Sequence, residues 1–221
     1  MVFHVLNRGV ARMQVFEKAG DYQAFERVLR EVLDETPMRV CAYCLMPSHW
    51  HMLLWPERDG ELATFMQRLT ITHVRRWQEH RHYAGLGHVY QGRYKSFPVE
   101  EDEHFLAVAR YVERNALRAN LVVRAEEWRW SSLWRRSCGT AEEQAVLAAW
   151  PLEVPRDWLE RVNRADTEKE LEVLRRSVQR GRPYGATEWQ KRIAKRLGLE
   201  SAYRPPGRPG IARRNAEPID S

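Results

Sequence analysis

The chain has 221 residues, a length that suits one large domain or two small ones and buries a core without disulfide or metal supports. Hydrophobic residues make up 43% and charged residues 30%, which indicates a soluble globular protein and excludes disordered and collagen-like classes. No apolar run approaches the roughly 20 residues that span a bilayer, and the first ten residues do not resemble a secretory signal. Three cysteines are too few for a disulfide framework, so we expect a reducing, cytoplasmic environment.

The net charge of +6 is unevenly distributed along the chain. Between Arg175 and Arg214 there are twelve basic residues and only two acidic ones, so this stretch carries +10. A basic segment attached to a slightly acidic body is the distribution expected of a protein that binds a polyanion. Charge therefore favours nucleic acid as the partner, and the alternative is a solvated basic surface without one.

Hydrophobic periodicity predicts a series of strands and helices. In chain order we expect a strand over 2–10, a helix from an N-cap at Asp21 to about Leu33, strands over 39–44 and 49–55, a helix over 61–80, a strand over 90–99, and a helix after the acidic residues 100–103. This order favours an α+β fold in which an antiparallel sheet carries packed helices.

The rest of the chain differs in composition. The segment 126–134 holds three tryptophans and is expected to close the first body, and helices are predicted over 168–180 and 187–197. From Pro205 the chain is rich in proline and glycine. We therefore divide it into a body over 1–135, a helical basic extension over 136–204 and a flexible basic tail over 205–221.

Two histidines are the first candidates for chemistry. His49 and His51 are two residues apart on a predicted strand, so their imidazoles lie on one face and can reach one metal ion, while Trp50 points into the core. Such a triplet alone is a weak indication of a metal site.

Tyr111 and Asn115 form the second candidate pair, because residues four apart share one face of a helix. A tyrosine hydroxyl can attack phosphorus and form a covalent phosphotyrosine, and an asparagine oxygen can ligate a hard cation. Taken alone, a core tyrosine beside a surface amide is the simpler explanation.

Cys41 and Cys44, followed by the two histidines, allow a zinc site. The two cysteines have opposite strand parity and would face opposite sides of the sheet, and Pro47 separates them from the histidines. Buried structural cysteines explain the pattern better.

Arg93 and Lys95 share a face of the predicted strand over 90–99 and could contact a phosphate backbone. Tyr90 and Tyr94 are rival nucleophiles, or stacking partners for unpaired bases. A surface strand with ordinary charges is the alternative.

Three runs of residues together resemble the IS200-like, single-tyrosine (Y1) HUH transposases, and among these most closely the REP-associated tyrosine transposases (RAYTs). They are Pro47–His51, Gln91–Ser96 and Arg110–Val122, and the similarity continues through Trp130–Ser132 and Arg176–Gly185. It covers nearly the whole chain in order. Two features differ from the family pattern. The chain begins almost at its first strand, where relatives carry extra residues. Asn115 stands where insertion-sequence members have glutamine, and asparagine at this position is typical of RAYTs.

The resemblance implies a ferredoxin-like or RRM-like sheet with His49 and His51 on a central strand, Tyr111 on a helix beside it, and residues 1–135 as the catalytic domain. It also implies Mg²⁺ or Mn²⁺ held by the two histidines and Asn115. Because histidine is a softer ligand than Mg²⁺ prefers, we expect Mn²⁺ to work at least as well. The implied reaction is cleavage of single-stranded DNA near a hairpin, with strand transfer through a 5′-phosphotyrosine at Tyr111.

Basic residues are expected to contact the DNA on this hypothesis. They are Arg8, Arg93, Lys95, Arg118, Arg180, Arg182, Lys191 and Arg192. The basic extension either holds the hairpin or its flank, or folds back over the active site as a gate. The base that removes the proton of Tyr111 stays unassigned.

We expect single-stranded DNA hairpins as partners, no membrane, no small-molecule substrate, a monomer with a dimer as the alternative, and a nucleoid-associated location in the cytoplasm. Two other functions compete with the enzyme. One is a non-catalytic DNA- or RNA-binding regulator on the same fold. The other is a zinc-stabilised binding module that uses Cys41, Cys44 and the histidines.

Overall fold

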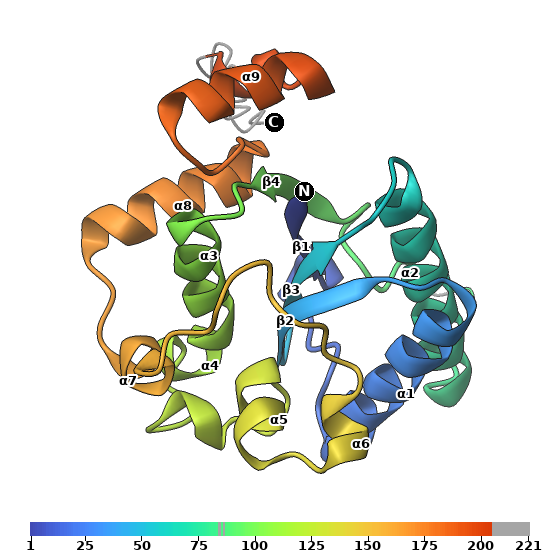
Figure 1. Ribbon diagram of the computed structural model, residues 1–221. Coiled ribbons are helices and arrows are strands. Elements are labelled where there is room, and N and C mark those ends of the chain that lie inside the picture. The colour runs from blue at the N-terminus through green and yellow to red at the C-terminus, as the bar shows by residue number, and fades with distance from the viewer. Residues whose placement is uncertain (84, 86, 205–221) are drawn as a thin grey trace, which may run out of the picture.

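Four strands form one antiparallel sheet in the order β2-β3-β1-β4 in the computed structural model, which describes residues 1–83, 85 and 87–204 (Figure 1). The strands are β1 (Val2–Arg8), β2 (Arg39–Met46), β3 (His49–Trp55) and β4 (Lys95–Val99). Together with the helices between them they follow the β-α-β-β-α-β order of a ferredoxin-like fold. The expected α+β fold is therefore confirmed.

Helices cover both faces of this sheet (Figure 1). Helices α1 (Ala19–Glu35) and α2 (Glu61–His80) pack on one face, and α3 (Glu103–Glu113) with the short α4 (Asn115–Arg118) packs on the other. Because side chains alternate along a strand, each face has its own buried cluster: Trp50 packs toward α1 and α2, whereas Leu53 packs toward α3. We call the two sides the α1/α2 face and the α3 face.

Two local predictions are wrong. Helix α1 begins at Ala19, and Asp21 is its third residue, whose carboxylate reaches back to accept the backbone N–H groups of Glu17 and Lys18. Strand β4 begins only at Lys95, because Tyr90 makes an isolated bridge to Gly9 and the chain then turns. Arg93 thus lies outside the strand in which we placed it.

The two cysteines of β2 show why strand parity misled. The register of β2 against β3 shifts between Val40 and Ala42, and such a bulge changes which face the following residues occupy. Cys41 and Cys44 consequently pack in the same cluster on the α3 face. Both are unpaired and buried, and burial raises the pKa of each thiol to about 12, as suits structural cysteines.

Chain segments from beyond the sheet cover both of its edges. On the β2 side, the N–H of Leu45 donates to the carbonyl of Trp130 over 2.9 Å. On the β4 side, the N–H of Tyr184 donates to Pro98 over 2.9 Å, and the N–H of Glu100 donates to Tyr184 over 3.0 Å. Unpaired edge strands promote aggregation, so these contacts protect the sheet and tie the later chain to it.

The C-terminal half is helical, and most of its buried side chains pack on the α3 face, whereas Val146 and Leu147 pack against the α1/α2 cluster. It contains α5 (Ser132–Cys138), α6 (Ala141–Gln144), α7 (Trp158–Asn163), α8 (Glu168–Arg180) and α9 (Thr187–Leu197), with 3₁₀ turns at Val10–Arg12, Ala125–Glu127 and Glu200–Tyr203. The bounds of α8 and α9 agree with prediction. Trp150, Trp158, Leu171 and Leu174 are buried in the same cluster as the α3 side chains. The predicted tail over 205–221 lies outside the described residues, and among those described no helix is both long and apolar enough to span a membrane.

Candidate active site

The two histidines of β3 lie on the α3 face, with ring centroids 5.1 Å apart. His51 is buried and its Nδ1 lies 2.8 Å from Nε2 of His4 on β1. In register His51 faces Leu6, so His4 reaches it diagonally across the strand pair. Since Nδ1 of His51 is engaged, its Nε2 is left for another partner.

All three imidazoles are neutral at neutral pH. Burial lowers the pKa of His4 to about 3 and that of His49 to about 4, and it lowers the pKa of His51 well below its ordinary value. The positive charges of Arg8 and Arg118 lower the pKa of the two β3 histidines further. Neutral imidazole is the form that ligates metals.

Tyr111 lies near the end of α3 and only 8% of it is exposed. Its ring centroid is 5.8 Å from that of His51 and 6.2 Å from that of His4. Asn115, also buried, follows Tyr111 by four residues but belongs to α4, because the helix is interrupted at Arg114. Arg114 keeps a right-handed helical conformation, so the spacing still turns both side chains to the α3 face.

Arg118 connects the tyrosine to the asparagine. Its guanidinium carbon lies 4.2 Å from the centroid of the Tyr111 ring, and it donates to Oδ1 of Asn115 over 2.7 Å. The buried Nδ2 of Asn115 has no hydrogen-bond partner within residues 1–204 as described. The amide oxygen of Asn115 thus accepts from the Arg118 guanidinium, and its second lone pair is free to ligate a metal ion.

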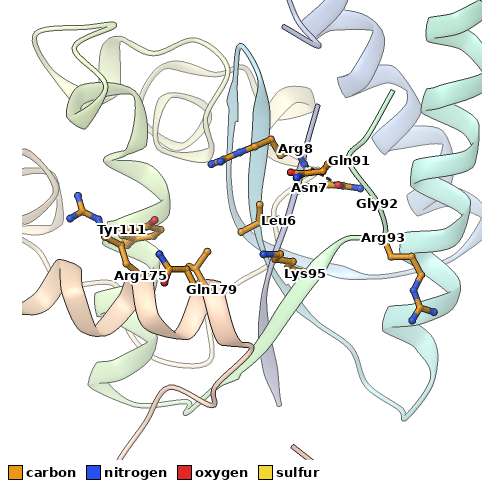
Figure 2. Close-up of a pocket in the computed structure, with 11 residues that line it drawn as sticks. Leu6, Asn7, Arg8, Gln91, Gly92, Arg93, Lys95, Tyr111, Arg175 and Gln179 are labelled. Carbon is orange, nitrogen blue, oxygen red and sulfur yellow. Dashed lines mark hydrogen bonds between the residues drawn. The ribbon is translucent and has the colours of Figure 1, made fainter. Parts of the chain in front are cut away.

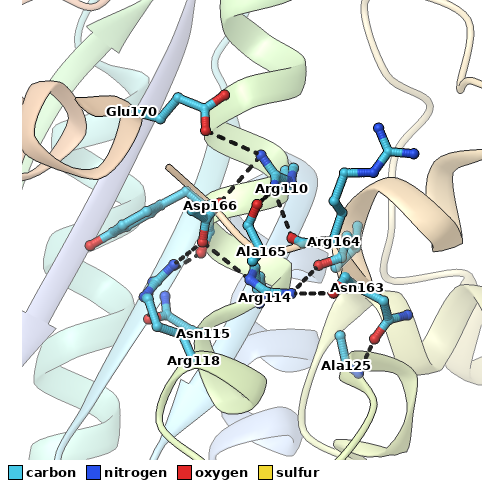
Figure 3. A network of polar contacts seen from close by, with 12 residues as sticks. Arg110, Arg114, Asn115, Arg118, Ala125, Asn163, Arg164, Ala165, Asp166 and Glu170 are labelled. Atoms are coloured by element: carbon cyan, nitrogen blue, oxygen red, sulfur yellow. Dashed lines mark hydrogen bonds and ion pairs between the residues drawn. The ribbon is translucent and has the colours of Figure 1, made fainter. Parts of the chain in front are cut away.

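A single carboxylate from the extension holds this arginine (Figure 3). Asp166, between α7 and α8, lies 3.3 Å from Arg110, 3.1 Å from Arg114 and 3.5 Å from Arg118, and its side chain is only 7% exposed. Arg110 and Arg114 also donate to backbone carbonyls between residues 161 and 165. The segment before α8 is thereby fixed to α3 beside the tyrosine.

A cleft of about 510 Å³ opens beside Tyr111 (Figure 2). Its polar lining includes Arg8, Arg93 and Lys95 from the body and Arg175 and Gln179 from α8. Figure 2 shows Arg175 next to Tyr111, whereas Arg93 points away from it toward α2. The cleft is thus positively charged and is built from both the sheet and the extension.

The expected DNA-binding residues fall into two groups. Arg8, Arg93, Lys95 and Arg118 lie in or beside the cleft of Tyr111. The other four lie elsewhere in the extension: Arg180 donates to the carbonyl of Arg204, Arg182 donates to that of Ala202, Lys191 pairs with Glu188, and Arg192 is on α9. Arg180 and Arg182 line a further cleft that shares Arg175 and Gln179 with the cleft of Tyr111, whereas Lys191 and Arg192 line neither of these two clefts.

The rival residues are separated from the site. The hydroxyl of Tyr90 lies on the α1/α2 face, 2.9 Å from both Trp50 Nε1 and His73 Nδ1, so the sheet lies between it and Tyr111. Among the described residues no group of three or more metal-ligating side chains includes a cysteine. One such group exists, Glu100, Asp102 and His104, whose ligand atoms lie within 4.8 Å of one another.

That acidic group is explained by local structure. Asp102 caps α3 by accepting the backbone N–H of His104, and it also contacts the His104 ring nitrogen over 2.8 Å. Glu100 accepts the N–H of Ala186 and so ties the chain before α9 to the start of α3. These contacts use the carboxylates for capping and tethering.

Sequence reasoning missed His4, Asp166, Arg175 and Gln179. Strand alternation could have shown that His4 shares a face with Leu6 and Arg8, and so with the histidines of an adjacent strand. Nothing local marks Asp166 or the α8 residues, because they meet Tyr111 only through the path of the extension.

These features define a class of protein: a ferredoxin-like sheet that presents a histidine pair to a tyrosine on the helix packed against it. Residues 1–115, just over half of the chain, match the family model described as IS200-like transposase. The chain therefore belongs to the IS200-like transposase family. This membership assigns it a transposase-type, DNA-processing function.

One solved structure supports the fold. A REP-associated tyrosine transposase bound to a REP hairpin is 18% identical over 69% of this chain and 87% of that chain, with a TM-score of 0.51. A putative transposase from Deinococcus radiodurans R1 is also 18% identical, over 51% of this chain and 88% of that chain, with a TM-score of 0.39. No curated protein matches the chain.

Proposed function

We propose that the protein cleaves single-stranded DNA at hairpins and transfers the cut strand through a 5′-phosphotyrosine on Tyr111. The observation that carries this proposal is the position of Tyr111, whose ring adjoins His51 and which lines a cleft with Arg8 and Lys95. A nucleophile for phosphorus, neutral nitrogen ligands and cations for phosphate meet at one place.

His49, His51 and Asn115 are the proposed ligands of a divalent ion, Mg²⁺ or Mn²⁺. Their chemistry fits, because both imidazoles are neutral and the Asn115 amide is buried with Nδ2 unpartnered among the described side chains. A bound ion would polarise the scissile phosphate and stabilise the charge that develops on it. The donor set favours Mn²⁺ at least as much as Mg²⁺.

The reaction balances with Tyr111 as nucleophile. Its oxygen attacks phosphorus, the bond from phosphorus to the 3′ oxygen breaks, and a 5′-phosphotyrosine and a free 3′-hydroxyl result. Attack by another 3′-hydroxyl reverses these steps and reseals the strand without ATP. Within the described chain the Tyr111 hydroxyl makes no hydrogen bond, so we assign its proton to no particular side chain. Arg8 and Arg118 would attract and orient the phosphate.

The extension over 136–204 is proposed to bind DNA outside the catalytic body over 1–135. Its contacts with the hairpin or its flank would come from Arg180, Arg182, Lys191 and Arg192. The protein is proposed to act as a monomer. Because Leu171 and Leu174 of α8 are buried in the core, deleting the extension would unfold its neighbours. Alanine substitution of Arg180 and Arg182 is the better test. It should weaken hairpin binding and reduce its salt dependence.

The test of the reaction is cleavage of a labelled library of single-stranded hairpins with Mn²⁺ by the wild type, Tyr111→Phe and Tyr90→Phe. We expect a covalent protein–DNA adduct on a denaturing gel from the wild type and Tyr90→Phe but not from Tyr111→Phe. An adduct that survives in Tyr111→Phe would show that another residue is the nucleophile.

The second candidate is a DNA- or RNA-binding regulator that does not cut. One observation favours it: Arg118 already occupies one lone pair of Asn115 Oδ1 and places a positive charge beside the proposed ion. Tight hairpin binding without an adduct from any of the three proteins, across metals and sequences, would support the regulator.

A further inference from the structure

A second groove lies between α2 and the segment 87–94. It encloses about 890 Å³, within the range of about 300–1,000 Å³ of cavities that hold drug-sized ligands. It shares Asn7, Gln91, Gly92 and Arg93 with the cleft of Tyr111, so the two depressions border the same loop, one on each face of the sheet. We call it the α2 groove.

The lining of the α2 groove is mostly apolar. Residues at helical spacing along α2, among them Gln67, Ile71 and Val74, form one wall, and Tyr94 lies on the other. Ile71 is 57% exposed although the neighbouring face of α2 is buried, and the Tyr94 ring is half-buried. An aliphatic side chain and a phenol ring that line one groove offer flat apolar contacts, and the Gln67 amide offers hydrogen bonds.

The rim of the groove is cationic. Arg75 of α2 and Arg93 are both exposed lining residues, and in residues 1–83, 85 and 87–204 neither makes an ion pair or a side-chain hydrogen bond. Two other arginines of the same helix, which do not line the groove, differ because Arg68 pairs with Glu35 and Arg76 pairs with Glu31, both on α1. Figure 2 shows Arg93 directed away from Tyr111 and toward α2.

We propose that the α2 groove binds the unpaired nucleotides that flank the scissile phosphate, with bases against Ile71 and Tyr94 and phosphates against Arg75 and Arg93. This rests on the proposed function, which places single-stranded DNA at Tyr111. Only an unpaired base exposes its ring face to such side chains, and stacking with phosphate contacts is how proteins bind single strands. A strand that leaves Tyr111 and crosses the loop at Gln91 and Gly92, before β4 begins, reaches this groove on the other face of the sheet.

The experiment compares DNA hairpins of one stem sequence that carry no arm, or an arm of eight thymidines on the 5′ or the 3′ side. Dissociation constants are measured by fluorescence anisotropy at several salt concentrations for the wild type, Ile71→Ala, Arg75→Ala and Arg76→Ala. Arg76→Ala is the matched control, because it removes an exposed arginine of α2 that does not line the groove. Ile71 is exposed, so its replacement leaves the fold intact.

We expect one of the two arms to tighten wild-type binding, and we expect Ile71→Ala and Arg75→Ala each to reduce that gain about five- to tenfold. Hairpins without an arm should bind all four proteins equally. Arg75→Ala should also lower the slope of log affinity against log salt by about 1, whereas Ile71→Ala should not change it. An arm of abasic sites has no bases to contact Ile71, so in the wild type it should tighten hairpin binding less than the thymidine arm does.

The proposal is overturned if neither arm tightens wild-type binding, or if Arg76→Ala reduces the gain as much as Arg75→Ala does. Adduct formation by Tyr111 is scored on the same oligonucleotides. An adduct without any contribution from the groove refutes this inference alone. A gain that depends on Ile71 and Arg75 without any adduct supports the groove and refutes the proposed chemistry.

Discussion

The two faces of the sheet each bury a histidine, but they use it differently. On the α1/α2 face, the Tyr90 hydroxyl accepts a hydrogen bond from Trp50 Nε1 and also forms one with Nδ1 of His73. No buried side-chain nitrogen or oxygen in this chain of contacts is left without a partner. On the α3 face, His4 contacts His51, and the contacts then reach Tyr111 at an open cleft.

The α3 face also keeps buried polar atoms without partners in the described structure, Nδ1 of His4 and Nδ2 of Asn115. An unsatisfied buried polar group costs about 1–3 kcal/mol, so a protein retains it where the group serves another purpose. Burial lowers the pKa of His4 and of His73 to about 3 alike, so protonation does not distinguish the two faces. What distinguishes the two faces is whether every buried polar atom of the group has a partner, and whether the group borders the open cleft.

Replacing His51 should abolish catalysis, whereas replacing His73 should lower stability. His51→Ala should lower Mn²⁺-dependent cleavage at least about a thousandfold, because a bound metal contributes several kcal/mol to the transition state. His73→Ala should leave Mn²⁺ binding unchanged and lower the free energy of unfolding by about 2–4 kcal/mol, because it opens a cavity and strands Tyr90. Cleavage assays and urea unfolding of both variants measure this, and loss of Mn²⁺ binding in His73→Ala would break the comparison.

The carboxylate that fixes the extension to the α3 face should matter more than an exposed one. Asp166→Asn leaves Arg110, Arg114 and Arg118 without their shared anion and should lower the free energy of unfolding by about 3 kcal/mol. Asp157→Asn, the matched control, removes an exposed pair with Arg161 and should leave the free energy of unfolding close to that of the wild type. Equal costs in urea unfolding would show that Asp166 does not hold the extension.

His4 should act on the metal through His51. His4→Phe keeps an aromatic ring but removes the partner of His51 Nδ1, and loss of such a contact weakens metal affinity about 10- to 100-fold. Mn²⁺ titration followed by electron paramagnetic resonance measures this, and metal-free hairpin affinity should not change. Tyr90→Phe, which removes the corresponding partner of His73, serves as the control and should leave Mn²⁺ affinity unaffected.

Acid should destabilise the metal-free protein through its buried histidines. The unfolded chain protonates His73 below about pH 6.5, while the folded protein does not until about pH 3, so stability is lost as the pH falls through this window. The expected loss is about 1.4 kcal/mol per pH unit for each such histidine. In urea unfolding at pH 7, 6 and 5, the free energy of unfolding should fall less steeply with decreasing pH for His73→Phe than for the wild type. His82→Gln, at an exposed position, should keep the wild-type slope.

Periodicity predicted the sheet, its helices and the placement of His49, His51 and Tyr111, because these depend on side-chain alternation within single elements. It failed at the β2 bulge and at the start of β4, where pairing with a neighbouring strand overrides the local pattern. It also gave no sign of α5, α6 and α7, which are short; α5 and α7 gain stability from side chains buried on the α3 face, whereas α6 buries none.

The amino-acid sequence by itself determined the family, the histidine pair and the tyrosine, because each is written into a short run of neighbouring residues. Only the tertiary structure decided that His4 supports His51, that Asp166 holds Arg118 beside Tyr111, and that α8 lines the cleft. These contacts join residues about 50 positions apart or more, where neither spacing nor propensity carries information. Chain path and packing alone bring them together.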